Sequence, residues 1–241
     1  MTSDTVDPTR YPDLAAAGTL AAALERLSAE LGLDLGPVTH QEADPYRAEL
    51  AGAAPDRGPC VIEARAGEPR FTLSCRSGGI ELLRATGAEL RELAEVAAVW
   101  HGGGSLHEVR PLVRPSVTFR TRAEAREHGP AHTVEFAWRW LHERARHLHR
   151  FPGFRLLVEA AYAQPRLRGL YPHTSHHILR FAGRTTYPFP REAPFVEPCH
   201  DGCYRVHAAT GGAVLHESAS AAEAVAVVLA HLPADLGPVT S

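Results

Sequence analysis

Three histidines and a serine lie close together in the run His-Thr-Ser-His-His, residues 173–177. Histidine titrates near neutral pH and can activate a neighbouring hydroxyl, so acid/base or nucleophilic chemistry is one interpretation. No Gly-x-Ser-x-Gly elbow surrounds Ser175, however, and adjacency in the sequence does not give triad geometry. A structural or binding role therefore explains this cluster better than catalysis.

The segment His176–Phe181 is predicted to be a strand that begins inside this cluster. Because side chains alternate along a strand, His176 and Arg180 are expected on one side and His177 on the other. His177 would then point into the core, and His176 would point toward solvent or a ligand. We therefore select as candidate binding residues His173, Ser175, His176 and Arg180.

A proline-aromatic run, Tyr187-Pro188-Phe189-Pro190, follows the predicted strand. Its prolines predict irregular backbone, and irregular loops on a rigid scaffold often carry function. The run is either an aromatic recognition loop or a lid that packs over the sheet. Tyr187 is added to the candidate binding residues on the first interpretation.

The turn Cys199-His200-Asp201-Gly202-Cys203 places two thiols around an Asp-Gly pair. Zinc, a disulfide or two free thiols are each compatible with this spacing. A structural zinc site needs four ligands, and no second CxxC or spaced histidine pair accompanies these cysteines. We therefore expect two free thiols, no metal site and no cofactor.

Two residue types are missing from the chain, which contains neither lysine nor asparagine. Without lysine there is no Schiff-base lysine, lysine-bound pyridoxal phosphate or P-loop lysine. Without asparagine there is no N-glycosylation acceptor and no Cys-His-Asn triad. These classes of chemistry are excluded.

Composition predicts an ordinary globular protein of the cytoplasm. The 241 residues are 44% hydrophobic and 22% charged, with a net charge of -3 that gives no attraction to nucleic acid or anionic membrane. No apolar run reaches the roughly 20 residues that span a bilayer, and no secretory signal is visible. Neither nucleic acid nor membrane is therefore expected as a partner.

Apolar periodicity predicts an α+β chain. The predicted strands are Cys60–Ala64, Arg70–Cys75, Ile80–Arg84, His176–Phe181, Cys203–Ala208 and Ala213–Glu217, and Leu106–Arg120 is expected to be extended. The predicted helices cover about 14–31, 86–101, 121–128, 132–150, 154–163 and 220–232, with a short one near Tyr46–Leu50.

Two segments of the chain, from Phe71 and from Tyr204, align with each other. Each reads as strand, Gly-Gly turn, strand and capped helix, with the capping pairs Thr86/Glu89 and Ser220/Glu223. The fold class predicted is therefore α+β, with two ββα-type pseudo-repeat units, short mostly antiparallel sheets and a helical middle. Extra strands, Cys60–Ala64 and His176–Phe181, are expected to complete the two units.

The corresponding domain organisation has five parts. They are an N-terminal tail and helix (1–58), a first β-rich unit with its helix (59–104), a helical arginine-rich middle (105–169), a second β-rich unit with its helix (170–233) and a tail (234–241).

Several segments together resemble a family known from actinobacteria, the domain-of-unknown-function family 6193. The most specific are AYAQPRLR and TTYPFPREAPFVEP, and the resemblance covers most of residues 60–233. It implies a cytoplasmic protein associated with natural-product biosynthesis, and it implies no catalytic residues.

The function predicted from the sequence is binding rather than catalysis. Because no catalytic signature is complete, we expect a non-catalytic binding or accessory protein that docks a peptide, a carrier or a partner protein. An immunity-type inhibitor is one form of such a protein. The alternative is an enzyme of specialised metabolism that uses the His173–His176 cluster for acid/base chemistry, which requires these groups to converge in a closed pocket.

Overall fold

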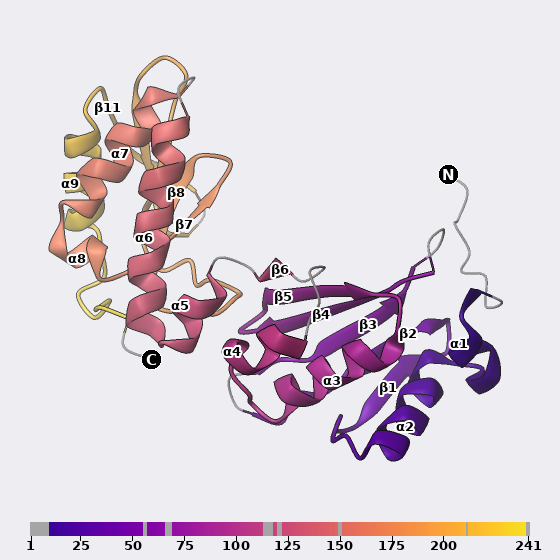
Figure 1. Ribbon diagram of the computed structural model, residues 1–241. Helices are drawn as coiled ribbons and strands as arrows, with labels where there is room; N and C mark the ends of the chain where they lie inside the picture. The colour runs from indigo at the N-terminus through magenta and orange to yellow at the C-terminus, as the bar shows by residue number, and fades with distance from the viewer. Residues whose placement is uncertain are drawn as a thin grey trace. The chain divides into compact units, whose positions relative to one another are not determined.

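The computed structural model describes residues 10–54, 57–65, 69–112, 118–119, 122–148, 151–210 and 212–239. The chain divides into two compact units, Met1–Ala123 and Glu124–Ser241, each with its own core (Figure 1). None of the helices in these described ranges is long and apolar enough to cross a membrane.

The first unit is built on a six-stranded sheet with the order β1-β2-β3-β4-β5-β6, in which every neighbouring pair is antiparallel. The strands are β1 Val38–Gln41, β2 Asp44–Leu50, β3 Cys60–Ala64, β4 Phe71–Ser77, β5 Ile80–Gly87 and β6 Thr118–Phe119. The three strands predicted between residues 60 and 84 are confirmed. Gly78 and Gly79 turn the chain between β4 and β5 with φ of 52° and 75°, a conformation that glycine adopts without steric cost.

Helices cover one face of this sheet and bury the first core (Figure 1). They are α1 Pro12–Ala17, α2 Leu20–Leu31, α3 Leu90–His101, α4 Leu106–Val109 and the 3-10 turn η2 Arg110–Leu112. The single helix predicted from residue 14 to 31 is two helices, because Gly18 (φ 81°) ends α1 and Thr19 caps α2. The apolar side of α3, including Leu93 and Trp100, packs against the strands.

The second unit contains a five-stranded antiparallel sheet with the order β11-β10-β9-β8-β7. The strands are β7 Tyr171–Ser175, β8 Ile178–Ala182, β9 Phe195–Pro198, β10 Tyr204–His207 and β11 Val214–Ser218. The predicted strand at residue 176 begins two residues later, because His176 and His177 form the turn between β7 and β8. This strand does not pair with the β10–β11 hairpin, since β9 lies between them.

Helices α6, α7 and α9 pack against one face of the second sheet. The helices of this part of the chain are α5 Ala123–Glu127, α6 Pro130–His147, α7 Pro152–Tyr162, α8 Pro165–Arg168 and α9 Ala221–Ala230. The indole of Trp138 on α6 donates to the carbonyl of Leu170 at 3.2 Å, and the hydroxyl of Tyr204 on β10 donates to the carbonyl of Gly153 on α7 at 3.1 Å. These two hydrogen bonds, the first buried and the second partly buried, hold α6 and α7 against the sheet.

Three local predictions are wrong. Tyr46–Leu50 is part of β2 rather than a helix, because alternate residues such as Ala48 and Leu50 are buried. Leu106–Arg120 begins as the helical turns α4 and η2 rather than as extended chain, while residues 113–117 and 120 lie outside the described ranges. Thr86 does not cap a helix, because β5 continues through it and Glu89 is the N-cap residue of α3.

The predicted α+β class is confirmed. Both aligned segments form a hairpin followed by a helix, β4-β5-α3 and β10-β11-α9. Leu73 and Val206 are equally buried in the two hairpins, but Leu82 is buried whereas its counterpart Leu215 is 39% exposed. A structural pseudo-repeat of the two units stays a prediction.

Candidate functional site

The β7–β8 and β9–β10 turns lie at the same end of the second sheet, because β8 and β9 are neighbouring antiparallel strands. A pocket of about 560 Å³ opens between these turns. Its volume is within the range of small-ligand sites, roughly 300–1,000 Å³. The pocket is lined by Phe151, His176, His177, Ile178, Glu197, Pro198, Cys199, His200, Asp201 and Arg205.

The β7–β8 turn supplies two of the three pocket histidines. His176 is exposed and adopts a positive φ of 54°, which is uncommon for a residue with a side chain. The ring of His177 packs on Phe151 and Phe154 at centroid distances of 4.8 and 5.7 Å. Burial lowers the pKa of His177, and the nearby positive groups of Arg144, His176 and His200 lower it further.

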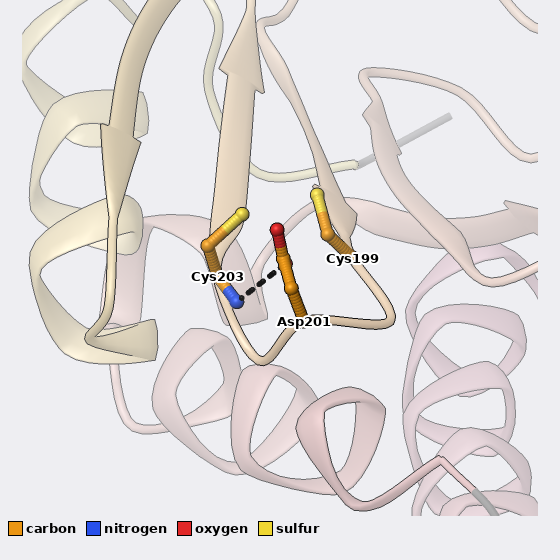
Figure 2. Close-up of side chains that lie close together, drawn as sticks. All are labelled: Cys199, Asp201 and Cys203. Atoms are coloured by element: carbon orange, nitrogen blue, oxygen red, sulfur yellow. Dashed lines mark hydrogen bonds between the residues drawn. The ribbon is translucent and has the colours of Figure 1, made fainter.

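The β9–β10 turn supplies His200 and the two cysteines. The Cys199 amide donates to the Cys203 carbonyl at 2.8 Å, and Gly202 has a φ of 89°. The carboxylate of Asp201 accepts a hydrogen bond from the Cys203 amide at 3.2 Å, which stabilises the turn. Figure 2 shows the side chains of Cys199, Asp201 and Cys203 pointing to the same side of this turn.

The three side chains of this turn affect one another's protonation. The carboxylate of Asp201 accepts a hydrogen bond from the Cys203 thiol, and together with Cys199 it raises the pKa of Cys203 to about 12. The same contacts with Cys203 lower the pKa of Asp201. Asp201 is therefore the anionic member of the group at neutral pH.

A second group of side chains lies on the face of the sheet opposite the helices. His173 on β7 is directly opposite Arg180 on β8, and its ring stacks on Phe189 with centroids 4.6 Å apart. Burial among these groups, together with the charge of Arg180, lowers the pKa of His173 to about 4. His173 is therefore neutral at physiological pH.

Arg180 continues this face toward β10. Its guanidinium carbon lies 3.6 Å from the centroid of the Phe195 ring, and Phe195 stacks in parallel on His207 at 4.7 Å. His207 contacts the Glu197 carboxylate at 3.1 Å. Arg180 and His207 are thus already engaged by groups of the same sheet.

Tyr187 lies on the loop between β8 and β9 and is 61% exposed. The peptide bond between Tyr187 and Pro188 is cis, and the Tyr187 ring contacts Phe189 edge-on at 5.7 Å. Phe189 covers His173 and Tyr171, so part of the loop is a lid over the sheet while Tyr187 remains at the surface.

The segments that form this site match a known family. Residues 132–241 match the family model described as "Family of unknown function (DUF6193)". This part of the chain is similar to DUF6193 domains. The resemblance seen in the sequence is confirmed for these residues, and its extension back to residue 60 lies outside the match. No curated protein and no solved structure matches the chain.

This DUF6193-like domain places the candidate binding residues in two separate groups. His173 and Arg180 are opposite each other on β7 and β8. The ring of Tyr187 contacts Phe189, which in turn stacks on His173. His176 lines the pocket at the end of the sheet, with Ser175 beside it at 3.4 Å from its ring nitrogen.

The pocket was not predicted from the sequence. Phe151 and Arg205 are far from the histidine cluster in the sequence, and His200 was interpreted as part of a structural turn. A signal for it was present. Histidines occur in two short turns, at 176–177 and at 200. The strands that make these turns parts of neighbouring hairpins, β7 and β9, were not predicted from the sequence.

Proposed function

We propose that this DUF6193-like domain is a binding module that docks an acidic peptide segment of a partner protein in the pocket between the β7–β8 and β9–β10 turns. The setting we propose is the cytoplasm, beside enzymes of natural-product biosynthesis, as the sequence resemblance implies.

The observation that carries this proposal is the gathering of positively chargeable groups around one pocket. His176, His177 and His200 line it, and Arg144 lies close enough to act on His177. These groups repel one another, and the pKa of His177 is lowered in part for that reason. A bound carboxylate relieves this repulsion, so an acidic ligand is favoured over a neutral or basic one.

The two carboxylates at the pocket are engaged by the domain itself. Glu197 contacts His207 at 3.1 Å, and Asp201 accepts from the Cys203 amide at 3.2 Å. Arg205 is paired with Glu217 at 2.6 Å, so the imidazoles are the groups best placed to meet an incoming anion. Phe151 and Ile178 give the pocket an apolar lining, which suits a peptide better than a free inorganic ion.

Non-catalytic binding accounts for the histidines better than acid/base catalysis does. His173 is stacked on Phe189 and lies outside the set of residues that line the pocket. The acid/base alternative requires His173 and His176 to converge on one substrate, and they occupy different surfaces of the sheet.

The test is fluorescence anisotropy of a labelled acidic peptide titrated with the full chain, with a neutral peptide of equal length as the comparison. We expect saturable binding of the acidic peptide that strengthens as the pH falls, because the lowered pKa of His177 leaves that imidazole mostly neutral at neutral pH and its protonated form attracts carboxylates. A His176→Gly, His200→Ala double variant should weaken binding about tenfold or more, at roughly 1 kcal/mol for each lost charged contact.

His132→Ala is the matched control, since it removes an exposed histidine from the opposite end of α6. At a rise of about 1.5 Å per residue, His132 is roughly 18 Å along the helix from Arg144. This variant should bind as the wild type does. Equal binding of the acidic and neutral peptides, or equal loss in the His132 variant, would refute the proposal.

A further inference from the structure

The turn between β9 and β10 brings three metal-ligating atoms together. The Sγ atoms of Cys199 and Cys203 and a carboxylate oxygen of Asp201 all lie within 4.8 Å of one another. They come from alternate residues, i, i+2 and i+4, of a turn closed by the Cys199–Cys203 backbone bond (Figure 2). This closure places the first and last ligands side by side, with Asp201 between them.

These distances suit a tetrahedral ion after small side-chain rotations. With Zn–S bonds of about 2.3 Å and Zn–O bonds of about 2.0–2.2 Å, two sulfurs on one zinc are about 3.8 Å apart. The backbone of the turn is already closed by the hydrogen bond from the Cys199 amide to the Cys203 carbonyl at 2.8 Å. Only the three side chains need to move.

The ligand types select the kind of ion. Thiolates favour borderline or soft cations such as Zn²⁺ over Mg²⁺ or Ca²⁺, which prefer oxygen. A second observation points the same way, because the turn borders a pocket whose lining includes His176, His177 and His200. Imidazole is the other common zinc ligand, and the set of three leaves a fourth position for water or a ligand group.

We propose that Cys199, Asp201 and Cys203 form a Zn²⁺ site at the rim of the pocket, with the fourth coordination position open. The expectation of free thiols rested on a requirement for four protein ligands, which applies to closed structural sites and not to open ones. This inference does not depend on the acidic peptide, because metal binding is measured without it.

The competing state of these residues is a Cys199–Cys203 disulfide. It forms by loss of two electrons and two protons to an oxidant, and it removes both thiolates from coordination. Metal binding releases the thiol protons instead and leaves the sulfurs reduced. A count of free thiols on unfolded protein that has never met a reductant separates the two states, because the disulfide removes two of them.

The experiment is a titration of the reduced, metal-free full chain with Co²⁺, a spectroscopic substitute for Zn²⁺, followed by displacement with Zn²⁺. We expect one ion per chain, a thiolate-to-cobalt charge-transfer absorption, and its loss on adding Zn²⁺ but not Mg²⁺. Cys199→Ser and Cys203→Ser should each abolish the absorption. Asp201→Asn keeps an oxygen that can accept from the Cys203 amide, and it should weaken binding at least roughly tenfold.

Asp235→Asn is the control for loss of one exposed carboxylate elsewhere in the same domain, and it should bind Co²⁺ as the wild type does. Absence of saturable binding overturns the proposal. So does an absorption that persists in the Cys199→Ser, Cys203→Ser double variant, since it would then arise from Cys60 and Cys75. Loss of acidic-peptide binding alone leaves the metal result unchanged, so the two proposals fail separately.

Discussion

His173 and Arg180 lie directly opposite each other on β7 and β8, yet each is held by a different aromatic ring. His173 stacks on Phe189, and the Arg180 guanidinium lies over Phe195. The pair is therefore part of a preformed surface, and its charge state is set by burial. The pocket at the end of the sheet differs, because its histidines lie in turns and line an open volume.

The first prediction concerns the titration of His173. Its pKa in the folded protein is about 4, compared with 6.5 for the free side chain, because burial and Arg180 disfavour the charged form. The unfolded chain therefore binds more protons between these values, and stability is lost as the pH falls through this window. The loss attributable to His173 is about 3 kcal/mol.

Imidazole proton shifts in NMR measure this titration directly, and urea unfolding of the His173→Gln variant measures its effect on stability. The variant should lose less stability than the wild type between neutral pH and about pH 4. A His173 titration near its ordinary value would contradict the buried stack.

The second prediction concerns the backbone at His176. Its φ of 54° costs about 1 kcal/mol for a residue with a Cβ, and glycine adopts it freely. His176→Gly should therefore leave the free energy of unfolding unchanged or raise it by up to about 1 kcal/mol, since the greater freedom of the unfolded chain offsets part of the gain. Thermal unfolding beside His176→Ala, which keeps the Cβ, checks this. A glycine variant less stable than the alanine variant would contradict the positive φ at residue 176.

The third prediction concerns the four cysteines. Cys60 and Cys75 face each other across β3 and β4, with sulfurs 2.7 Å apart and exposed fractions of 2% and 0%. Burial raises the pKa of Cys75 well above its ordinary value. Both should resist a thiol reagent at about pH 8 until the protein is unfolded, because a reagent needs an accessible thiolate.

Cys199 and Cys203 should react in the folded protein, with Cys203 slow because its pKa is about 12. Saturating Zn²⁺ should protect both and leave the buried pair unaffected. Mass spectrometry of the labelled peptides assigns each reaction. Rapid labelling of Cys75 in the native state would contradict its burial.

Local patterns in the sequence predicted much of the fold. The strands around residues 60–87 and the hairpin after 203 were readable because glycine turns separate alternating runs. Strand β9 was missed because it is very short, follows Pro194 and ends at Pro198. Its pairing partners, β8 and β10, supply the stabilisation that its own sequence lacks. The Thr86 cap failed because pairing of Thr72 with Thr86 extends β5 past the expected helix start.

The candidate site was harder to predict because it depends on which turns become neighbours. His176 was selected from its residue type and does line the pocket, whereas His200 was assigned to a turn of no function. His173 looked equally able to do chemistry, but its stacking on Phe189 depends on a loop conformation that local sequence does not specify.

The most direct test of the pocket proposal is an NMR titration of the full chain with the acidic peptide, observing the histidine side chains. We predict that the resonances of His176, His177 and His200 shift together and saturate, while those of His173 and His132 stay in place. A shift centred on His173 instead would place binding on the face of the sheet that carries Arg180 and contradict the pocket.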